Sequence, residues 1–357
     1  MIILRKYLAR EIYAATALVL VAFLMLFAFF DLINELNYLG KGNYRLQYVL
    51  LFVILSLPGH VYELVPIAVL IGTLYALAHL AANSEYTVMR ISGLSPYAAG
   101  AALARIGAIF VVLTFVFGEL VTPFAEREAQ QMRLSSMSTV VAQEFRSGLW
   151  VKDEFRFVNV REVMPDSTLK GVKIYEFDSD YRLRTISFAE SGEFKGGNSW
   201  RLRGVAQTRF DSLGTNVSRM DETDWNSVLT PDLLSVLLVQ PEKMSAVSLY
   251  QFTRHLTENR QQTDLYEIAM WKKLLYPFAT LVMMALALPF AYVQTRMGGL
   301  GAKIFSGIML GVLFHLLNGL SSSLGIIQNW APFYSAVLPS ALFLFGAMLM
   351  MWWVERR

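Results

Sequence analysis

Histidine and carboxylate side chains could supply metal or acid–base chemistry, so their number and spacing come first. The chain has no cysteine and four histidines, which are His60, His79, His255 and His315. Only His60 has a carboxylate at helical spacing, because Glu63 follows it by one turn. One histidine and one carboxylate make a poor zinc site, since such sites use three or four protein ligands. We interpret the pair as packing or as a structural polar contact.

Motifs of nucleotide-dependent and hydrolytic enzymes are missing from the chain. There is no G-x-x-x-x-G-K-[ST], no H-E-x-x-H and no G-x-S-x-G. The glycine-rich stretch Gly298–Lys303 lacks P-loop spacing and is interpreted as a flexible turn. Glu63 and Glu119 fall toward helix ends rather than forming a buried acid pair for proton coupling. We therefore expect no catalytic residue, no metal and no cofactor in this chain.

A polar stretch between two apolar runs has the residue types of a docking helix. Glu85 suits the positive first turn of a helix, Asn83 or Ser84 can cap it, and Gly93 ends it. The face predicted to fit the groove of another protein consists of Ser84, Glu85, Tyr86, Met89, Arg90 and Gly93. A helix lying on lipid is the alternative, which Glu85 and the single basic residue disfavour.

A second pattern lies near the C-terminus, where small and polar residues recur on one stripe of a helix. The stripe consists of Gly307, Gly311, His315, Asn318 and Ser322. Two glycines four residues apart allow another helix to approach closely. The polar members favour a face turned toward protein or a cavity rather than lipid. Simple helix packing and a lateral opening remain equal alternatives.

The elements that position these patterns are apolar enough to lie in a membrane. Of the 357 residues, 55% are hydrophobic and 17% are charged, against about 25% charged in soluble proteins. A span needs about 20 apolar residues. Six stretches qualify, namely Ile12–Leu32, Val49–Leu80, Tyr97–Val121, Leu274–Val293, Ile304–Leu324 and Pro332–Val354. Pro58 and Pro66 predict a tilted or kinked second span.

Basic residues in the short loops predict the orientation of these spans. With the N-terminus inside, the cytoplasmic side holds Arg5, Lys6, Arg10, Arg90, Arg296, Lys303, Arg356 and Arg357. The opposite short loops hold only Lys41 and Arg45. Both termini are therefore expected in the cytoplasm. The net charge of +3 follows from this distribution, so a nucleic-acid partner is not expected.

Charge gathers in the middle of the chain, where 38 of the 59 charged residues lie between Glu126 and Asp264. The apolar period there changes to two, as in Val172–Phe177, and Gly196-Gly197-Asn198 predicts a hairpin turn. We expect an α-helical membrane protein with six transmembrane helices and an inserted all-β, jelly-roll-like domain. The predicted boundaries are 1–123, with the docking helix at 84–94, then 124–265 for the β-domain and 266–357.

Five motifs, in this order and with these intervals, match a known family. They are Ser84-Glu85-x-x-Val88-Met89-x-x-Ser92-Gly93, Gly118-Glu119-x-Val121-x-Pro123, Gly148-Leu149-Trp150-x-Lys152-Asp153, Met270-Trp271-x-Lys273-x-x-x-Pro277 and Gly307-Ile308-x-x-Gly311-x-x-Phe314. Over nearly its whole length the chain resembles the LptF/LptG (YjgP/YjgQ) family of lipopolysaccharide export permeases, and more its LptG branch than its LptF branch. The resemblance implies a multi-pass protein of the Gram-negative inner membrane with a periplasmic β-domain.

The resemblance implies how the docking helix works. Glu85–Gly93 is similar to the family's coupling helix, which sits in a groove of the LptB ATPase dimer. Glu85 would make the ionic contact, with Tyr86 and Met89 as apolar anchors. ATP and magnesium would be bound by that partner, so this chain would be a transport subunit rather than an enzyme.

The resemblance also implies a lateral gate, which the first and fifth spans form with the sister permease LptF and which admits lipopolysaccharide among the membrane lipids. The gate and cavity residues would be Phe27, Phe30, Asp31, Lys41, Lys303, Gly307, Gly311, Phe314, His315 and Asn318. Some members place lysines at the outer end of the first span, but here only Lys41 and Arg45 stand nearby. The β-domain would pass the lipid to LptC and the LptA bridge.

Three other functions fit parts of the sequence. A membrane-anchored scaffold could recruit periplasmic β-domain proteins without transporting anything. The chain could also be the LptF-type sister subunit. A mechanotransmitting subunit of the lipoprotein-release type is the third, although such proteins usually have four spans per subunit.

Overall fold

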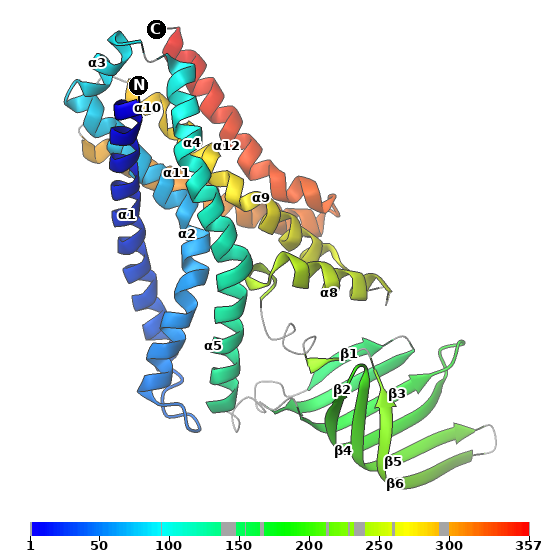
Figure 1. Cartoon of the computed structure of the whole chain (residues 1–357). Coiled ribbons are helices and arrows are strands. Elements are labelled where there is room, and N and C mark those ends of the chain that lie inside the picture. Colours follow the sequence, from blue (N-terminus) through cyan, green and yellow to red (C-terminus); the bar gives the residue numbers. More distant parts are fainter. Residues whose placement is uncertain are drawn as a thin grey trace.

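The computed structural model describes residues 2–93, 95–136, 148–153, 155–164, 168–211, 214–227, 229–231, 240–258, 261–292 and 300–356. A helical bundle and a β-sheet domain make up this part of the chain, and both ends of the chain lie at the bundle end far from the sheet (Figure 1). The expected architecture of six apolar helices with an inserted β-domain is confirmed.

The helices follow the predicted apolar runs and extend most of them. Their bounds are α1 (Ile2–Leu36), α2 (Leu46–Ala82), α3 (Glu85–Ile91), α4 (Pro96–Val116), α5 (Thr122–Ser136), α8 (Ala246–Glu258), α9 (Asp264–Ala287), α10 (Pro289–Tyr292), α11 (Leu300–Ile327) and α12 (Pro332–Glu355). A π-helix, Phe117–Val121, joins α4 to α5, and a 3-10 turn, Pro241–Lys243, precedes α8.

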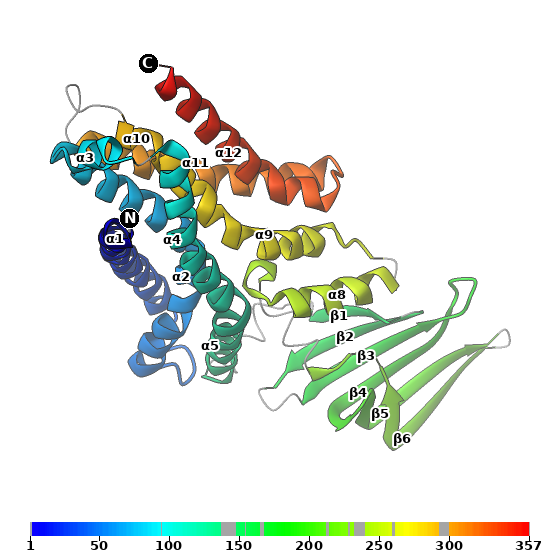
Figure 2. The ribbon, with the colours of Figure 1, turned by 45° about the horizontal axis from the view of Figure 1, so that its top comes forward.

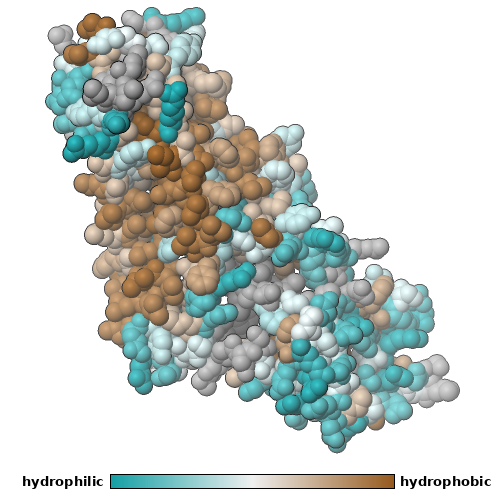
Figure 3. All heavy atoms as spheres, viewed as in Figure 1, coloured by the Kyte–Doolittle hydropathy of each residue, from teal (hydrophilic) through white to brown (hydrophobic). Residues whose placement is uncertain are grey.

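Six of these segments are long and apolar enough to cross a membrane within the described residues. They are Lys6–Leu36, Leu46–Ala82, Tyr97–Arg133, Asp264–Tyr292, Gly301–Ile327 and Pro332–Val354. A continuous apolar zone covers the bundle, with hydrophilic residues at its far end and over the sheet domain (Figure 3). Since lipid tails hydrate no polar group, this zone is where the bundle meets the hydrocarbon.

Helix α2 is the centre of the bundle. In its most apolar stretch 83% of the residues are buried, against 6% in α1 and 22% in α11. The helix runs without interruption through Pro58 and Pro66. Helices α1, α9 and α11 all pack against it. The outer helices therefore share one internal support and turn much of their own surface outward.

Glycines allow α1 and α11 to pack closely against α2. A Cβ on Gly72 of α2 would lie 2.6 Å from the backbone N and Cα of Thr16 in α1. A Cβ on Gly307 or Gly311 of α11 would lie 2.5 Å and 2.6 Å from the side chains of Leu74 and Ile67, both in α2. Small residues at such crossings are how membrane helices approach without a hydrophobic driving force.

The β-domain is one antiparallel sheet whose strands lie in sequence order. The strands are β1 (Leu149–Asp153), β2 (Arg156–Val163), β3 (Leu169–Phe177), β4 (Leu183–Gly196), β5 (Ser199–Asp211) and β6 (Gly214–Asn226). The predicted hairpin is confirmed between β4 and β5, where Gly196 and Gly197 adopt φ of +110° and +64°. A jelly roll needs Greek-key connections, and the described strands form a simple meander instead.

One face of the sheet carries the domain's apolar core. Trp200 is fully buried there, and its indole N–H donates to the Leu229 carbonyl over 2.6 Å. Val158, Leu169 and Leu202 pack in the same cluster. The alternation of β5, with Arg201 and Arg203 on the opposite face, follows from the two-residue period of a strand.

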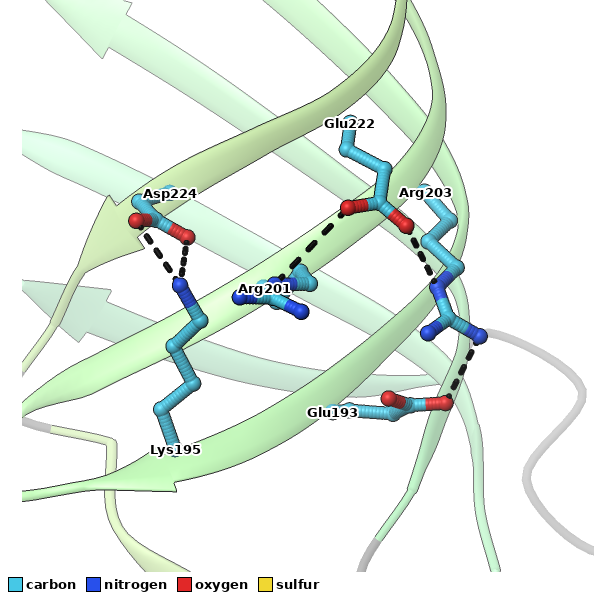
Figure 4. A network of polar contacts seen from close by, with 6 residues as sticks. All are labelled: Glu193, Lys195, Arg201, Arg203, Glu222 and Asp224. Carbon is cyan, nitrogen blue, oxygen red and sulfur yellow. Dashed lines mark hydrogen bonds and ion pairs between the residues drawn. The ribbon is translucent and has the colours of Figure 1, made fainter.

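The opposite face carries a ladder of ion pairs across β4, β5 and β6 (Figure 4). Its pairs are Lys195–Asp224 at 2.7 Å, Arg203–Glu193 and Arg203–Glu222 at 3.0 Å each, and Arg201–Glu222 at 3.8 Å. The bond from Lys195 lowers the pKa of the Asp224 carboxyl. Exposed pairs of this kind add little stability, but charge along the edge strand β6 opposes unwanted pairing with other chains.

Candidate functional site

The short helix α3 forms where the sequence predicts a docking helix, at the bundle end that holds both chain ends (Figures 1 and 2). Gly93 follows it with φ +97°, which favours glycine. The predicted side-chain cap does not form. Ser84 has φ +61°, and the Asn83 amide contacts the His79 ring over 3.2 Å instead.

The predicted exposure of two α3 anchors is wrong. Tyr86 is 3% exposed and Met89 6%, and both belong to the chain's own apolar core. The Tyr86 ring meets the Tyr292 ring of α10 edge-on, with centroids 5.3 Å apart. Residues three apart share a helix face, so this pair fastens α3 to the bundle.

The free apolar face of α3 is the opposite one. Val88 is 60% exposed and Ile91 82%, and Tyr97 at the start of α4 is 88% exposed. Glu85 is partly exposed and Ser84 is exposed beside them. The side chain of Arg90 lies outside the described residues. The sequence shows two apolar pairs with the same spacing of three residues, Tyr86 with Met89 and Val88 with Ile91. Spacing alone does not tell which of the two pairs faces the protein interior.

The stripe predicted on α11 divides between two environments. Gly307 and Gly311 lie against α2, as close helix packing requires. Phe314, predicted among the cavity residues, belongs to the chain's apolar core. His315 is exposed and Asn318 half-buried. The Asn318 carbonyl accepts from Lys272 of α9 over 2.8 Å.

Apolar side chains that point away from the core cover α1 and α11. On α1 they are Leu18, Val21, Met25, Leu26, Phe29, Phe30 and Ile33; on α11 they are Phe305, Met309, Val312, Leu313, Leu316 and Leu320. Both helices lie against α2, so their free faces flank the same central helix. Patches of this extent mark a surface that meets lipid or another protein.

The predicted gate residues of α1 are joined to α2 by a polar contact. The Asp31 carboxylate and the His60 ring nitrogen Nε2 are 2.6 Å apart, and Phe27 packs on the same ring with centroids 5.1 Å apart. His60 therefore pairs with Asp31, 29 residues away, rather than with Glu63. Within the described residues no group of three metal-binding side chains occurs.

Lys303 also lies in the chain's interior. Its side chain is buried, and its ammonium donates to the Phe290 carbonyl of α10 over 3.3 Å. The contact joins the start of α11 to α10, the helix on which Tyr86 packs.

The ends of α1 and α5 that lie away from the two chain ends bring together cations that the sequence separates. Arg133 of α5 lies over the Tyr38 ring at 4.2 Å, and Lys41 lies over the same ring at 4.6 Å. Arg133 also pairs with the buried Glu35 at 3.4 Å, and Tyr44 donates to that carboxylate over 2.7 Å. Burial, with this bond, raises the pKa of Tyr44. Sequence reasoning missed Arg133, because no local pattern links residues 38 and 133.

A joint of polar contacts connects the bundle to the chain that returns from the sheet. The Glu119 carboxylate accepts from the backbone N–H groups of Ala246, over 2.8 Å, and Val247, over 3.4 Å, at the start of α8. Glu119 lies on the π-helix, a form found often at functional sites. About two turns further, on α5, Glu126 pairs with Lys243 at 3.2 Å.

Replacing Glu119 with alanine is expected to loosen this joint. The first turn of α8 would lose its charged acceptor, at a cost of about 1–2 kcal/mol. The melting temperature of the purified chain in detergent should fall, while Glu119→Gln, which keeps one acceptor oxygen, should retain most of the stability. Glu128→Ala on the exposed side of α5 is the control. Equal melting temperatures for Glu119→Ala and Glu128→Ala would contradict the capping role.

Comparison with known proteins identifies one family over nearly the whole length of the chain. The model of a family described as lipopolysaccharide export system permease LptF/LptG matches residues 6–353. The chain is 30% identical to the lipopolysaccharide export system permease protein LptG of Haemophilus influenzae, covering 99% of this chain and 98% of that protein. It is 28% identical to the LptG of Escherichia coli K12, with the same coverage.

Proposed function

Because the chain belongs to the LptF/LptG family of lipopolysaccharide export system permeases, we propose that it works as one of two permeases around a shared lipid path. It is a multi-pass inner-membrane transport subunit of lipopolysaccharide export. The sister permease, of the LptF type, would complete the path. Both termini and α3 would face the cytoplasm and the sheet the periplasm, as the basic residues of the short loops favour.

The open faces of α1 and α11 are the observation that carries this proposal. In their most apolar stretches only 6% of the residues of α1 and 22% of those of α11 are buried, and both helices pack on the buried α2. A second permease could place its own helices against these faces and leave a lateral entrance between the two chains. Asp31 of α1, which pairs with His60 of α2, and His315 and Asn318 of α11 supply the polar groups along these helices. On the opposite face of α11, Gly307, Gly311 and Phe314 pack against α2 and the core.

The energy for moving the lipid would come from an ATPase of the LptB type that binds ATP and magnesium. Its groove would receive Val88, Ile91 and Glu85, since these are the free apolar side chains and a carboxylate of α3. Tyr86 and Met89 would transmit the motion, because they tie α3 to α10 and the core. This replaces the anchoring role that the sequence predicts for the two residues.

The lipid's phosphate groups would meet Lys41 and Arg133 beside Tyr38. Both cations lie at the outer end of α1, where the sequence shows a shortage of positive charge. From there the lipid would pass along the sheet domain to LptC and the LptA bridge. The buried Glu35 pairs with Arg133 at 3.4 Å, and the Arg133 side chain is 23% exposed.

Changing Lys41 to glutamine is expected to weaken lipopolysaccharide binding by roughly threefold to tenfold, the value of one partly exposed charged hydrogen bond. Binding of the assembled complex to purified lipopolysaccharide would be measured by microscale thermophoresis at fixed salt. Arg254→Gln, at an exposed pair on α8, is the matched control. If Lys41→Gln binds lipopolysaccharide with unchanged affinity, Lys41 does not contact the lipid.

Photocrosslinking in cells tests the proposed path directly. A photoreactive residue would be placed at Phe30 of α1, at Leu316 of α11 and at Phe345 of α12, all exposed on the bundle. We expect lipopolysaccharide or a second permease at the first two positions and bulk phospholipid at Phe345. Pull-down of the tagged chain should recover an ATPase and a second permease. Equal crosslinking at the three positions, or no ATPase, would overturn the proposal.

A further inference from the structure

Two consecutive lysines, Lys272 and Lys273, lie in the membrane-spanning helix α9, and the function proposed above uses neither of them. Lys273 is only 5% exposed. A charged side chain inside a span is costly and marks a functional contact. An apolar side chain would fill the same place without that cost, so the contacts of the two ammonium groups indicate their role.

The ammonium of Lys273 fastens the chain that returns from the sheet domain. It donates to the Glu242 carbonyl over 3.2 Å, in the 3-10 turn that precedes α8. It also lies over the Tyr62 ring of α2, 4.5 Å from the centroid. The π-helix packs on the same ring, because a Cβ on Gly118 would lie 2.6 Å from two of its carbons. Lys273 therefore joins α9 and α2 to the returning chain.

This contact adds a third helix to the joint at the start of α8. Glu119 of the π-helix and Glu126 of α5 already hold the same stretch of chain. Lys273 holds it from α9. The carboxylates of Glu119 and Glu63 lie close enough to act on the ammonium, so the joint balances the charge that it buries.

Lys272 contacts a different neighbour. Successive residues of a helix point about 100° apart, and the ammonium of Lys272 donates to the Asn318 carbonyl of α11 over 2.8 Å. The Ser322 hydroxyl donates to the same carbonyl over 3.2 Å. Helix α11 carries one of the two open faces beside the proposed lipid path. Adjacent residues of α9 thus hold a wall of that path and the chain that leads from the sheet.

We propose that Lys272 and Lys273 are positioning residues that couple α11 to the sheet domain. The inference rests on the proposed function, since it takes α11 as a wall of the lipid path. A shift of α11 that admits lipid moves this turn of α9 through Lys272. Lys273 passes the movement to the chain between the sheet and α8. The sheet domain then changes its position when lipid enters the bundle.

Spin labels on the full-length chain measure this coupling. The chain has no cysteine, so labels attach only where a cysteine is introduced. Suitable positions are Ile109 of α4, Ile327 of α11 and Val217 of β6, which are 56%, 75% and 61% exposed. Double electron–electron resonance gives the distance from Ile109→Cys to Ile327→Cys within the bundle. The distance from Ile109→Cys to Val217→Cys reports the position of the sheet.

The first measurement is made without lipid. Methionine has a similar length and no donor, so Lys273→Met should broaden the distribution of bundle-to-sheet distances. Lys272→Met should broaden the distances to α11, and Lys272→Arg, which keeps a donor, should restore them. Arg254→Met, which breaks an exposed ion pair on α8, is the matched control, and size-exclusion chromatography checks that the variants fold. Equal bundle-to-sheet distributions in Lys273→Met and Arg254→Met would overturn the proposal.

The second measurement adds purified lipopolysaccharide to the assembled complex. We expect both distances to shift in the unchanged chain. Lys272→Met and Lys273→Met should still bind the lipid but lose the shift of the sheet. A sheet shift of unchanged size in either variant would overturn the coupling. If the unchanged complex binds no lipopolysaccharide, the proposed function fails instead, and the distances without lipid decide the inference by themselves.

Discussion

Replacing Gly72 with valine is expected to separate α1 from α2 and to give the largest loss of stability of any single change in the bundle. The new Cβ would lie 2.6 Å from the backbone N and Cα of Thr16. Backbone atoms cannot rotate away as a side chain can, so the two helices must move apart along their whole contact. Overpacking of this kind costs about 1–3 kcal/mol and sometimes more.

The measurement is thermal unfolding of the purified chain in a mild detergent, followed by size-exclusion chromatography. Gly346→Val on α12 is the matched control. It makes the same change in a membrane helix, and its Cβ meets nothing within 4 Å. Gly72→Val should melt at a clearly lower temperature or aggregate. If the two valine variants melt together, Gly72 does not set the distance between α1 and α2.

Replacing Ile91 with aspartate is expected to abolish binding of the proposed LptB-type ATPase while leaving the permease folded. Ile91 is 82% exposed, so the new charge costs the isolated chain little. In a complex the same charge would be buried against an apolar groove, which costs several kcal/mol unless it is paired. Recovery of the ATPase with the tagged chain should fall by at least tenfold. ATP-driven export should fall with it.

Two controls separate docking from folding. Ile327→Asp makes the same change at a similarly exposed residue, 75%, at the other end of the bundle, and it should retain the ATPase. Met89→Ala empties a buried position and should lower the melting temperature instead. Glu85→Lys should weaken docking by reversing its charge. Normal recovery of the ATPase by Ile91→Asp would exclude this face of α3 as the docking surface.

The spans and the sheet domain were predictable because their signals are local. Twenty apolar residues in a row, an alternating run such as Val172–Phe177, or a glycine pair such as Gly196-Gly197 between two such runs, identify an element without its neighbours. The position of α3 followed from Glu85 and Gly93 in the same way. Periodicity therefore sufficed wherever the element itself was the question.

Which face an element turns inward was not predictable, since that depends on contacts between distant residues. Tyr86 and Val88 head two stripes of equal spacing. Contacts with distant residues, such as the Tyr292 ring about two hundred positions later, decide between them. The pairing of His60 with Asp31 depends likewise on how α1 crosses α2. The contacts of Arg133 with Tyr38 and Glu35 were not predictable for the same reason. The meander of the sheet, too, is a matter of strand order rather than strand pattern.

The carboxylate of Glu119 has a consequence for how the protein is made. It satisfies the backbone donors of a helix that begins 127 residues later. During synthesis the first three spans and the sheet leave the ribosome before that helix exists. When α8 emerges, the acceptor for its first turn is already in the membrane. The acceptor that caps this helix is therefore synthesised before the donors that it satisfies.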